Sequence, residues 1–429
     1  MIKKFSPNSY RFIKWCQIIV FMLLFLNFYT AIGSSQWLQW GGPNRNFKVD
    51  SAQLKTTWTE EGPGQLWKRQ LGEGYSAICV DQGTLYTMFR RGDEDVVTSL
   101  NADTGKTLWE YAYTSLPWKE FSKQYGPGPH ATPLIVGDYI YAIGFRTELT
   151  CLDKKNGQKV WSHNLWDEYN AKPGDRGYAS SPMAYKNLLI VLAGGKDHGV
   201  MAFNLKDGQL VWKGQDFINS YSSPIIINVD GQDQLIVFVE GKVASLDPNT
   251  GDLLWQHAHN TQYQIHASTP IWGKDNILFI SSAYDAGSRA LHLSLQNGKT
   301  VVKELWYNEK VRVQHGSAVR IGETIYASSG HGPAFLTAVT VETGEITTQQ
   351  RGFGKANLMM AGHQMIILDE AGQLAIVNAN PNSFDVLAES EVLTSRAWTV
   401  PTLAGGKIYL RDMKEILALD IGVNTKIER

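Results

Sequence analysis

Short runs of alternating apolar and polar residues recur along the chain, separated by turn residues. The clearest form four segments that align without gaps: SLNADTGKTLWEY around Gly105, CLDKKNGQKVWSH around Gly157, AFNLKDGQLVWKG around Gly208 and SLDPNTGDLLWQH around Gly251. A period of two indicates β-strands, and a glycine after Asp, Asn or Thr indicates the tight turn of a hairpin. In each copy a tryptophan falls four residues after the glycine, so the second strand of each predicted hairpin carries one large aromatic ring.

The copies recur at the spacing of propeller blades. Weaker copies follow around Gly298 and Gly344, and successive glycines are 52, 51, 43, 47 and 46 residues apart, close to the roughly 40 to 50 residues of one blade. Two further strand patterns precede most copies, and the first opens with Ser, Thr or Val before Pro. Proline suits the first position of a strand, where no ladder donor is lost. Each unit therefore predicts four strands, with the tryptophan on the outermost.

The count of units predicts a closed ring. A degenerate seventh copy begins at Leu374, and an eighth begins at Ile416 but lacks its outer strand. The sequence QLWKRQ at 65–70 has the pattern of an orphan outer strand, so it can complete the last blade and remove exposed sheet edges. We predict an all-β, eight-bladed β-propeller of four-stranded antiparallel blades, closed by this N-terminal strand, with residues 37–429 as one domain.

The first 33 residues differ from the rest. Four basic residues precede an apolar stretch from Ile18 to Phe28, and small residues follow near Gly33, which predicts a cleaved signal peptide at 1–33. The alternative is a retained membrane anchor, because Trp15–Ile32 approaches the length of a span. Cys16 precedes the apolar run and no cysteine follows the cleavage region, so we do not predict a lipoprotein. The expected location is periplasmic or secreted.

Composition narrows the classes of partner. The 429 residues are 43% hydrophobic, enough for a large core, and 40 Lys plus Arg balance 41 Asp plus Glu. The net charge is −1 and the chain has no basic stretch, so the sequence does not predict the positively charged surface that binds nucleic acid. Cys79 and Cys151 lie in strand patterns of different repeats, where we expect buried thiols rather than a disulfide.

The recurring L-x-x-D-x-x-T-G-x-x-x-W pattern, together with WLQWGGPNRN at Trp37 to Asn46, is similar to the pyrroloquinoline-quinone-like propeller repeat family. The resemblance covers nearly the whole chain after the first 36 residues and implies the fold. Its members include quinone-dependent alcohol and glucose dehydrogenases and a lipoprotein that assists outer-membrane protein assembly. The dehydrogenases carry adjacent cysteines beside the cofactor and long insertions between blades. Here Cys79 and Cys151 are 72 residues apart, and the chain is compact.

A candidate site follows from the predicted topology. The start of each inner strand and the link between its second and third strands lie at one end of the ring, facing a central funnel. We expect a ligand or partner site at this rim, formed by Arg90, His130, Arg146, Tyr178, Tyr221, His266, Tyr284, His315, His331, Arg396, Trp398 and Arg411. Alternatively these are solvated loop residues paired with their neighbours. Two long links, 113–129 and 164–177, carry further aromatics that either cover the funnel or fold back onto the blades.

No complete catalytic constellation is apparent, so no catalytic residue is assigned. His257 and His259 alternate on one strand without a third ligand, and no metal site is predicted. The leading hypothesis is a monomeric, non-catalytic envelope propeller, without a cofactor, that holds a protein segment or a glycan at its funnel end. The alternative, implied by the family resemblance, is an oxidoreductase for alcohols or sugars that depends on pyrroloquinoline quinone (PQQ) and Ca²⁺, with Asp93 or Asp285 as base.

Overall fold

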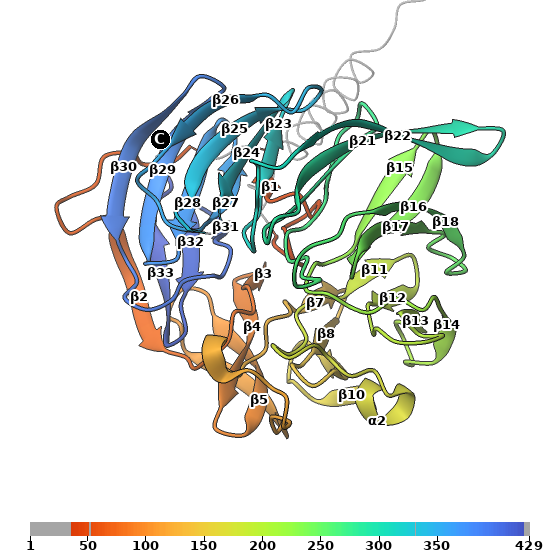
Figure 1. The fold of residues 1–429 in the computed structure, drawn as a ribbon. Coiled ribbons are helices and arrows are strands. Elements are labelled where there is room, and N and C mark those ends of the chain that lie inside the picture. Colours follow the sequence, from red (N-terminus) through yellow and green to blue (C-terminus); the bar gives the residue numbers. More distant parts are fainter. Residues whose placement is uncertain (1–35, 51–52, 331, 424–429) are drawn as a thin grey trace, which may run out of the picture. The chain divides into compact units, whose positions relative to one another are not determined.

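The computed structural model describes residues 36–50, 53–330 and 332–423, and these form eight sheets around a central axis (Figure 1). Each sheet contains four antiparallel strands that follow one another outward from the axis, and one sheet gains a fifth, parallel strand. The predicted eight-bladed β-propeller is therefore confirmed. The predicted signal peptide at 1–33 and the candidate site residue His331 lie outside the described residues. No helix in the described part of the chain is long and apolar enough to cross a membrane.

Blades 1 to 4 occupy the first half of the ring. Their strands are β3 (Cys79–Asp81), β4 (Thr84–Arg91), β5 (Glu94–Asn101) and β6 (Thr107–Thr114); β7 (Leu134–Val136), β8 (Tyr139–Ile143), β9 (Glu148–Asp153) and β10 (Lys159–Asn164); β11 (Met183–Tyr185), β12 (Leu188–Val191), β13 (Val200–Asn204) and β14 (Leu210–Gly214); and β15 (Ile225–Val229), β16 (Gln232–Val239), β17 (Lys242–Leu246) and β18 (Leu253–Ala258). A 3₁₀ turn, η1 (Lys123–Tyr125), and a short helix, α2 (Leu165–Tyr169), lie in the two long links.

Blades 5 to 8 complete the ring. Their strands are β19 (Ile271–Trp272), β20 (Ile277–Ser282), β21 (Gly287–Gln296) and β22 (Lys299–Asn308); β23 (Val319–Ile321), β24 (Thr324–Ser329), β25 (Phe335–Thr340) and β26 (Ile346–Gln350); β27 (Ala356–Ala361), β28 (Gln364–Asp369), β29 (Gln373–Asn380) and β30 (Ser383–Glu391); and β31 (Thr402–Ala404), β32 (Lys407–Arg411), β33 (Glu415–Asp420) and β2 (Gly64–Gln70). Blade 7 departs from the predicted four strands, because β1 (Lys48–Val49) pairs in parallel with β27.

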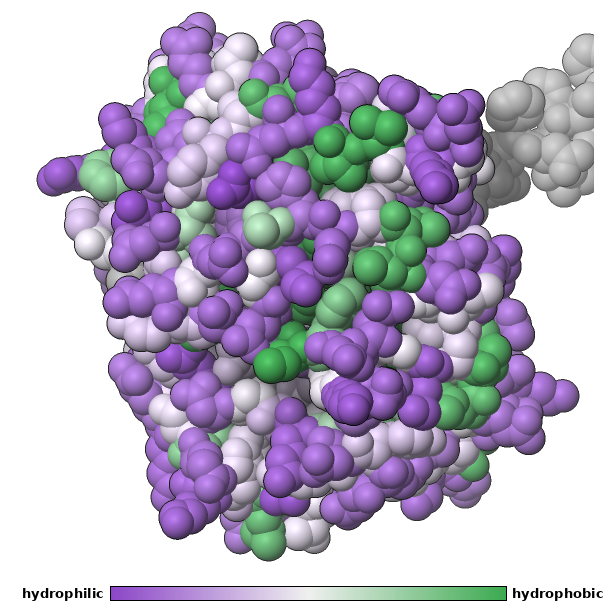
Figure 2. All heavy atoms as spheres, turned by 45° about the vertical axis from the view of Figure 1, so that its right-hand side comes forward, coloured by the Kyte–Doolittle hydropathy of each residue, from purple (hydrophilic) through white to green (hydrophobic). Residues whose placement is uncertain are grey.

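Burial separates the middle strands from the outer ones. Neighbouring blades cover both faces of a middle strand, so β16 and β20 are almost continuously buried. Outer strands such as β6 alternate between exposed and half-buried residues. Figure 2 shows one face of the molecule, on which small apolar groups are separated by polar side chains. The apolar core therefore lies between the blades.

The outer tryptophans join neighbouring blades. The Trp109 ring of blade 1 lies against the turn at Gly157 in blade 2, where a Cβ atom would stand 2.5 Å from the ring. Its Nε1 donates a hydrogen bond of 3.0 Å to the carbonyl of Lys154. The same ring-on-glycine contact occurs for Trp67 on Gly105, Trp161 on Gly208, Trp212 on Gly251 and Trp306 on Gly344. The glycine thus supplies both a positive φ and the space that the preceding blade's ring needs.

The boundary between blades 4 and 5 is built differently. A Cβ atom at Gly298 would meet open space, so Trp255 has no glycine partner in blade 5. Trp255 Nε1 instead donates to Gln234 Oε1 of its own blade at 2.8 Å, and Gln234 Nε2 donates to Thr300 Oγ1 of blade 5 at 2.7 Å. A buried amide therefore replaces the ring-on-glycine contact here.

Hydroxyl groups join the blades near the axis. The N–H of Ala77 in blade 1 donates to Thr132 Oγ1 in blade 2 at 3.1 Å. Thr132 N–H donates to Ser181 Oγ of blade 3, and Ser181 N–H donates to Ser223 Oγ of blade 4, both at 2.9 Å. Thr132, Ser181 and Ser223 are the residues that precede proline at the start of inner strands. The repeated Ser/Thr-Pro pattern therefore provides an inner link between blades as well as a strand start.

Two features close the ring at blade 8, one within that blade and one between it and blade 1. Strand β2 pairs with β33, as predicted for residues 65–70, and Trp67 lies opposite Ala418. Arg411 of β32 is fully buried and donates to the carbonyl oxygens of Met88 at 2.6 Å and Gly72 at 3.1 Å in and beside blade 1. Burial lowers the pKa of Arg411 to about 10, so the guanidinium remains charged at neutral pH.

Residues 37–49, named here the plug segment, run across the channel and contact distant blades. Trp37 exchanges two backbone hydrogen bonds with Val80 in blade 1, and Trp40 Nε1 donates to Thr269 Oγ1 beside blade 5 at 2.9 Å. The buried Arg45 donates to Pro182 O at 3.2 Å and Pro224 O at 3.0 Å, beside blades 3 and 4. The repeat pattern predicts no position in the fold for these residues.

Two buried histidines lie where blade 4 meets blade 5. The His266 ring stacks on Phe238 with centroids 4.1 Å apart, and its Nδ1 shares a 2.7 Å hydrogen bond with Ser282 Oγ. The His259 ring lies 5.6 Å from that of His266. Burial lowers the pKa of both histidines to about 3, so both rings are neutral at neutral pH.

Gly157→Ala should destabilise the fold more than Gly298→Ala. Both glycines have positive φ, +72° and +74°, so alanine is strained at either by roughly 1 kcal/mol. Only at Gly157 does the new methyl group collide with a tryptophan ring, which adds roughly 1–3 kcal/mol. Urea unfolding of both variants measures the difference, and equal losses would contradict the ring-on-glycine contact.

His266→Gln should make the protein less sensitive to acid. Because the folded-state pKa of His266 is lowered to about 3, the unfolded chain, with a histidine pKa near 6.5, binds the proton more readily. The stability from the neutral ring is present above about pH 6.5 and falls as pH decreases toward about 3. Between pH 6 and 4 the free energy of unfolding falls as the pH decreases. This fall should be smaller in the variant than in the wild type by up to ~1.4 kcal/mol per pH unit. Parallel pH curves for the variant and the wild type would refute this.

Candidate functional site

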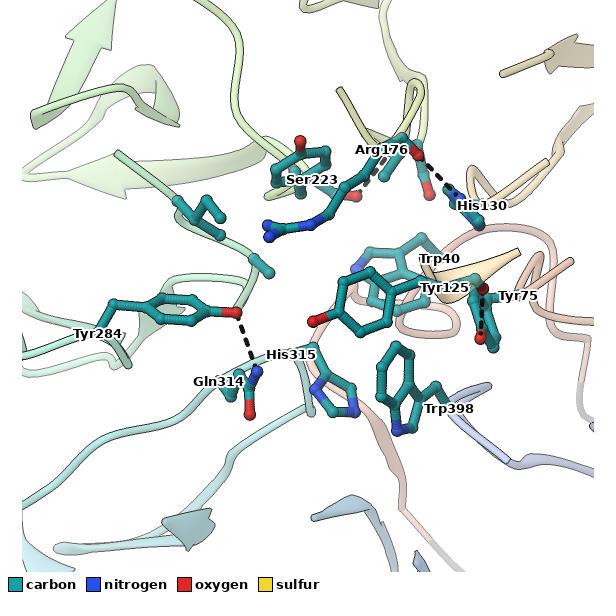
Figure 3. A pocket seen from close by; sticks show the side chains of 15 residues that line it. Trp40, Tyr75, Tyr125, His130, Arg176, Ser223, Tyr284, Gln314, His315 and Trp398 are labelled. Carbon is teal, nitrogen blue, oxygen red and sulfur yellow. Dashed lines mark hydrogen bonds between the residues drawn. The ribbon is translucent and has the colours of Figure 1, made fainter. Parts of the chain in front are cut away.

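A cavity of about 160 Å³ opens in the channel at the end where the inner strands begin. The plug segment contributes Trp40 to its lining. Figure 3 shows aromatic side chains from several blades pointing toward the same space. The large rings that line it are Trp40, Tyr75, Tyr125, Tyr221, Tyr284 and Trp398.

One position of the repeat supplies much of this lining. The residue four places before the inner strand faces the cavity in seven blades. In chain order these residues are Tyr75, His130, Ala179, Tyr221, Ala267, His315 and Trp398. In blade 7 this position is Gly352, which does not line the cavity. The fold therefore brings one side chain per blade to the axis, and the sequence sets its chemistry.

One wall of the cavity is a packed aromatic cluster around Trp398. Ring centroids of His315, Tyr75 and Tyr125 lie 4.4, 5.2 and 5.5 Å from that of Trp398. Tyr75 also stacks on His130 at 5.2 Å. Packed rings of this kind hold one another in place, so this wall is preorganised.

The histidines of the wall are neutral at neutral pH. Burial lowers the pKa of His130 to about 4. Burial lowers the pKa of His315 to about 3, and the positive charges of Lys355 and Arg396 act in the same direction. His130 Nε2 lies 3.2 Å from the carbonyl oxygen of Arg176, which can only accept, so this nitrogen carries the proton. Its Nδ1 is a buried acceptor without a partner among the described residues.

The opposite side carries polar groups. The guanidinium of Arg176 extends into the cavity (Figure 3), and Gln314 Nε2 donates to the hydroxyl of Tyr284 at 2.9 Å. Gln314 Oε1 is buried and has no hydrogen-bond partner in the described part of the chain. The site thus combines aromatic faces with a small number of donors and acceptors, as binding pockets do.

The donor set does not fit PQQ with Ca²⁺. The lining residues include no carboxylate, and no group of three or more His, Cys, Asp or Glu among the described residues could hold a metal ion. Asp93 and Asp285, the candidate bases, are about 70% exposed and do not line the cavity, and Asp285 pairs with Arg312 at 3.0 Å. The cavity is also smaller than the roughly 300–1,000 Å³ of typical ligand pockets. Cys79 and Cys151 are free and buried, as expected.

Five of the predicted rim residues come together in the cavity: His130, Tyr221, Tyr284, His315 and Trp398. A sixth, Arg396, does not line the cavity but packs on one of its rings, with its guanidinium carbon 4.7 Å from the centroid of the Trp398 ring. All except Tyr284 lie in the links that lead into inner strands.

The structure places five other predicted rim residues away from the cavity. Arg90 pairs with the buried Asp95 at 3.4 Å, and Arg411 closes the ring as described. Tyr178 is buried among apolar side chains, and His266 is buried against Phe238 and Ser282. The Arg146 guanidinium stacks over Trp166 at 4.2 Å. Arg90 and Arg411 lie at or near the ends of second strands, and Arg146 follows one; each is engaged by its own or a neighbouring blade.

The aromatic residues of the two long links, 113–129 and 164–177, adopt both of the predicted arrangements: some fold back onto a blade and one reaches the funnel. Trp118 and Trp166 pack against each other with ring centroids 5.2 Å apart, and Trp118 also stacks on Phe145 at 5.7 Å, so these rings fold back onto blade 2. Tyr125 of η1 reaches the cavity instead.

Several residues that line the cavity were not predicted from the sequence. Tyr75 occupies the same repeat position as His130 and Tyr221, so an exact alignment on the inner strands would have found it. Trp40 and Arg176 belong to segments outside the repeat, where no periodic signal exists.

Comparison with known proteins agrees with this architecture. A family model described as outer membrane protein assembly factor BamB matches residues 93–350, more than half of the chain. The uncharacterised protein RP232 of Rickettsia prowazekii is 22% identical over 291 residues, which cover 62% of this chain but only 65% of that protein, slightly less than two thirds of its length.

Two solved structures share the fold. BamB from Moraxella catarrhalis superposes with a TM-score of 0.60 at 15% identity, covering 85% of this chain and 99% of that one. The quinohemoprotein alcohol dehydrogenase from Comamonas testosteroni also gives 0.60, at 12% identity, covering 90% and 80%. The repeats, the ring of eight blades and the family match lead to one conclusion: the chain belongs to the pyrroloquinoline-quinone-like β-propeller family that includes the outer membrane protein assembly factor BamB.

Proposed function

We propose that the protein is a non-catalytic binding propeller of the cell envelope, which holds a group of a protein segment or a glycan in the aromatic cavity. The observation that carries this proposal is the preorganised lining, in which stacked rings and neutral histidines surround a space without a carboxylate. The description of its family as an outer membrane assembly factor, together with the signal peptide expected at 1–33, supports the location.

The size of the cavity limits what can enter it. An apolar cavity of roughly 150 Å³ accommodates one benzene molecule. The 160 Å³ here therefore suits a single ring of a larger partner, with the rest of the partner lying over the mouth. Each blade is completed by strands of the same chain, so the ring needs no second copy to form its core, and we expect a monomer.

The family resemblance to quinone-dependent dehydrogenases supports only the shared fold. The lining residues lack the acidic ligands that Ca²⁺ favours and a carboxylate base, so no redox step is derived for this chain.

Tyr284→Ala should weaken partner binding at least about tenfold, because it removes one ring from the cavity wall. The measurement is capture from an envelope extract and on a glycan array by the immobilised full chain. Tyr307→Ala is the matched control, because Tyr307 is an exposed tyrosine on the outer strand β22. Equal capture by the two variants would count against the cavity as the binding site.

Adding PQQ and Ca²⁺ to the purified protein should produce neither saturable quinone binding nor dye reduction with alcohols or sugars. The reason is the missing acidic ligand set around the cavity. Fluorescence titration and a dye-linked assay test this, with a quinoprotein alcohol dehydrogenase reconstituted in parallel as positive control. Saturable binding accompanied by turnover would establish the oxidoreductase instead.

A further inference from the structure

Two guanidinium groups lie beside one tyrosine ring of the cavity lining. The guanidinium carbon of Arg176 lies 5.2 Å from the ring centroid of Tyr125, and that of Arg396 lies 5.7 Å from it. The ion pairs that arginines form in the described part of the chain include neither residue. Arg176 Nε is also buried without a hydrogen-bond partner there. Two positive charges beside one ring, neither of them in an ion pair within the described chain, favour an anion bound at this side of the cavity.

Two carboxylates beside the cavity, Asp175 and Glu370, already accept hydrogen bonds from rings of its wall. Asp175 accepts a hydrogen bond of 3.2 Å from the hydroxyl of Tyr221, and Glu370 accepts one of 3.1 Å from Trp398 Nε1. Neither acidic residue lines the cavity. They hold the rings in position and leave the charge inside the cavity positive.

The edges of the cavity offer hydrogen bonds as well as charge. Figure 3 shows the hydroxyl groups of Tyr125 and Tyr284 pointing into it. Gln314 Oε1 and His130 Nδ1 are buried acceptors without partners in the described chain. A purely apolar ring would leave Gln314 Oε1 and His130 Nδ1 unmatched, at a cost of roughly 1–3 kcal/mol for each buried polar group. An aspartate or glutamate side chain would satisfy the arginines but is too slender to contact the aromatic faces.

We propose that the cavity recognises a sugar ring that bears a carboxylate, as in a uronic acid. The C–H face of such a ring packs on the aromatic wall around Trp398, and its hydroxyl groups meet Tyr125, Tyr284 and Gln314. Its carboxylate pairs with the guanidinium of Arg176, and Arg396 adds a second positive charge beside Tyr125. This assignment rests on the proposed binding function and names the ligand of that same site. The carboxylated ring can belong to a free sugar acid or to an acidic glycan.

The test is isothermal titration of the full chain with methyl β-D-glucuronide and methyl β-D-glucoside, which differ in the carboxylate. The wild type should bind the glucuronide at least about tenfold more tightly, and added salt should reduce the preference. Arg176→Gln should abolish the preference and leave the urea midpoint unchanged, because the guanidinium forms no ion pair in the described chain. Arg146→Gln is the matched control, since that arginine also stacks on an aromatic ring but outside the cavity. It should retain the preference.

Equal affinity for the two glycosides, or an undiminished preference in Arg176→Gln, would overturn the assignment. If neither glycoside binds but Tyr284→Ala still abolishes capture of a protein, the sugar ligand is wrong and the binding function stands. If capture does not depend on Tyr284, the binding function itself fails. A parallel titration with tetragalacturonate separates the two sources: binding of the oligomer supports an acidic glycan, and binding of the monosaccharide alone supports a free sugar acid.

Discussion

The contact between a tryptophan ring of one blade and a glycine turn of the next is the interaction on which the ring depends. It recurs at five boundaries between blades, and each time the indole occupies the space that a side chain on the glycine would need. In four of these the indole N–H also donates to a carbonyl oxygen of the adjoining turn. Apolar packing and one directed hydrogen bond thereby fix the angle between neighbouring sheets.

A second row of contacts lies near the axis and defines the site. The hydroxyl groups of Thr132, Ser181 and Ser223 accept backbone hydrogen bonds from the preceding blades. Each of these links lies two residues after the position that faces the cavity. The same backbone geometry that joins the blades therefore aims His130 and Tyr221 at the axis. Substitution at the cavity position can change what is bound without altering the links.

Much of the fold was accessible from the sequence because it repeats. The turn glycine, the tryptophan four residues later and the proline at inner strands recur often enough to give the number of blades and the closing strand β2. The contact of Trp255 with Gln234, in place of a glycine turn, could not be predicted. Nothing in the sequence of blade 4 shows that Gly298 of blade 5 does not meet the Trp255 ring.

The site was accessible only in part, for the same reason. His130, Tyr221, His315 and Trp398 occupy a repeated position, so topology predicted that they face the funnel. Arg90 and Arg411 were predicted to face the same rim, yet buried hydrogen bonds within and between blades engage both. Trp40 reaches the cavity from the plug segment, whose path depends on contacts hundreds of residues away in sequence.

The pairing of β2 with β33 also constrains the order of events during biosynthesis. The hydrogen-bonded side chains of Gln70 and Glu415 at the end of this pair are separated by 345 positions in the chain. A ribosome has therefore added 345 residues after Gln70 before the earliest outer strand meets its neighbour. Until then, strand edges that the finished molecule conceals remain available to chaperones or to misassembly. Release of the C-terminal strands is the event that commits the molecule to a closed, cooperative unit.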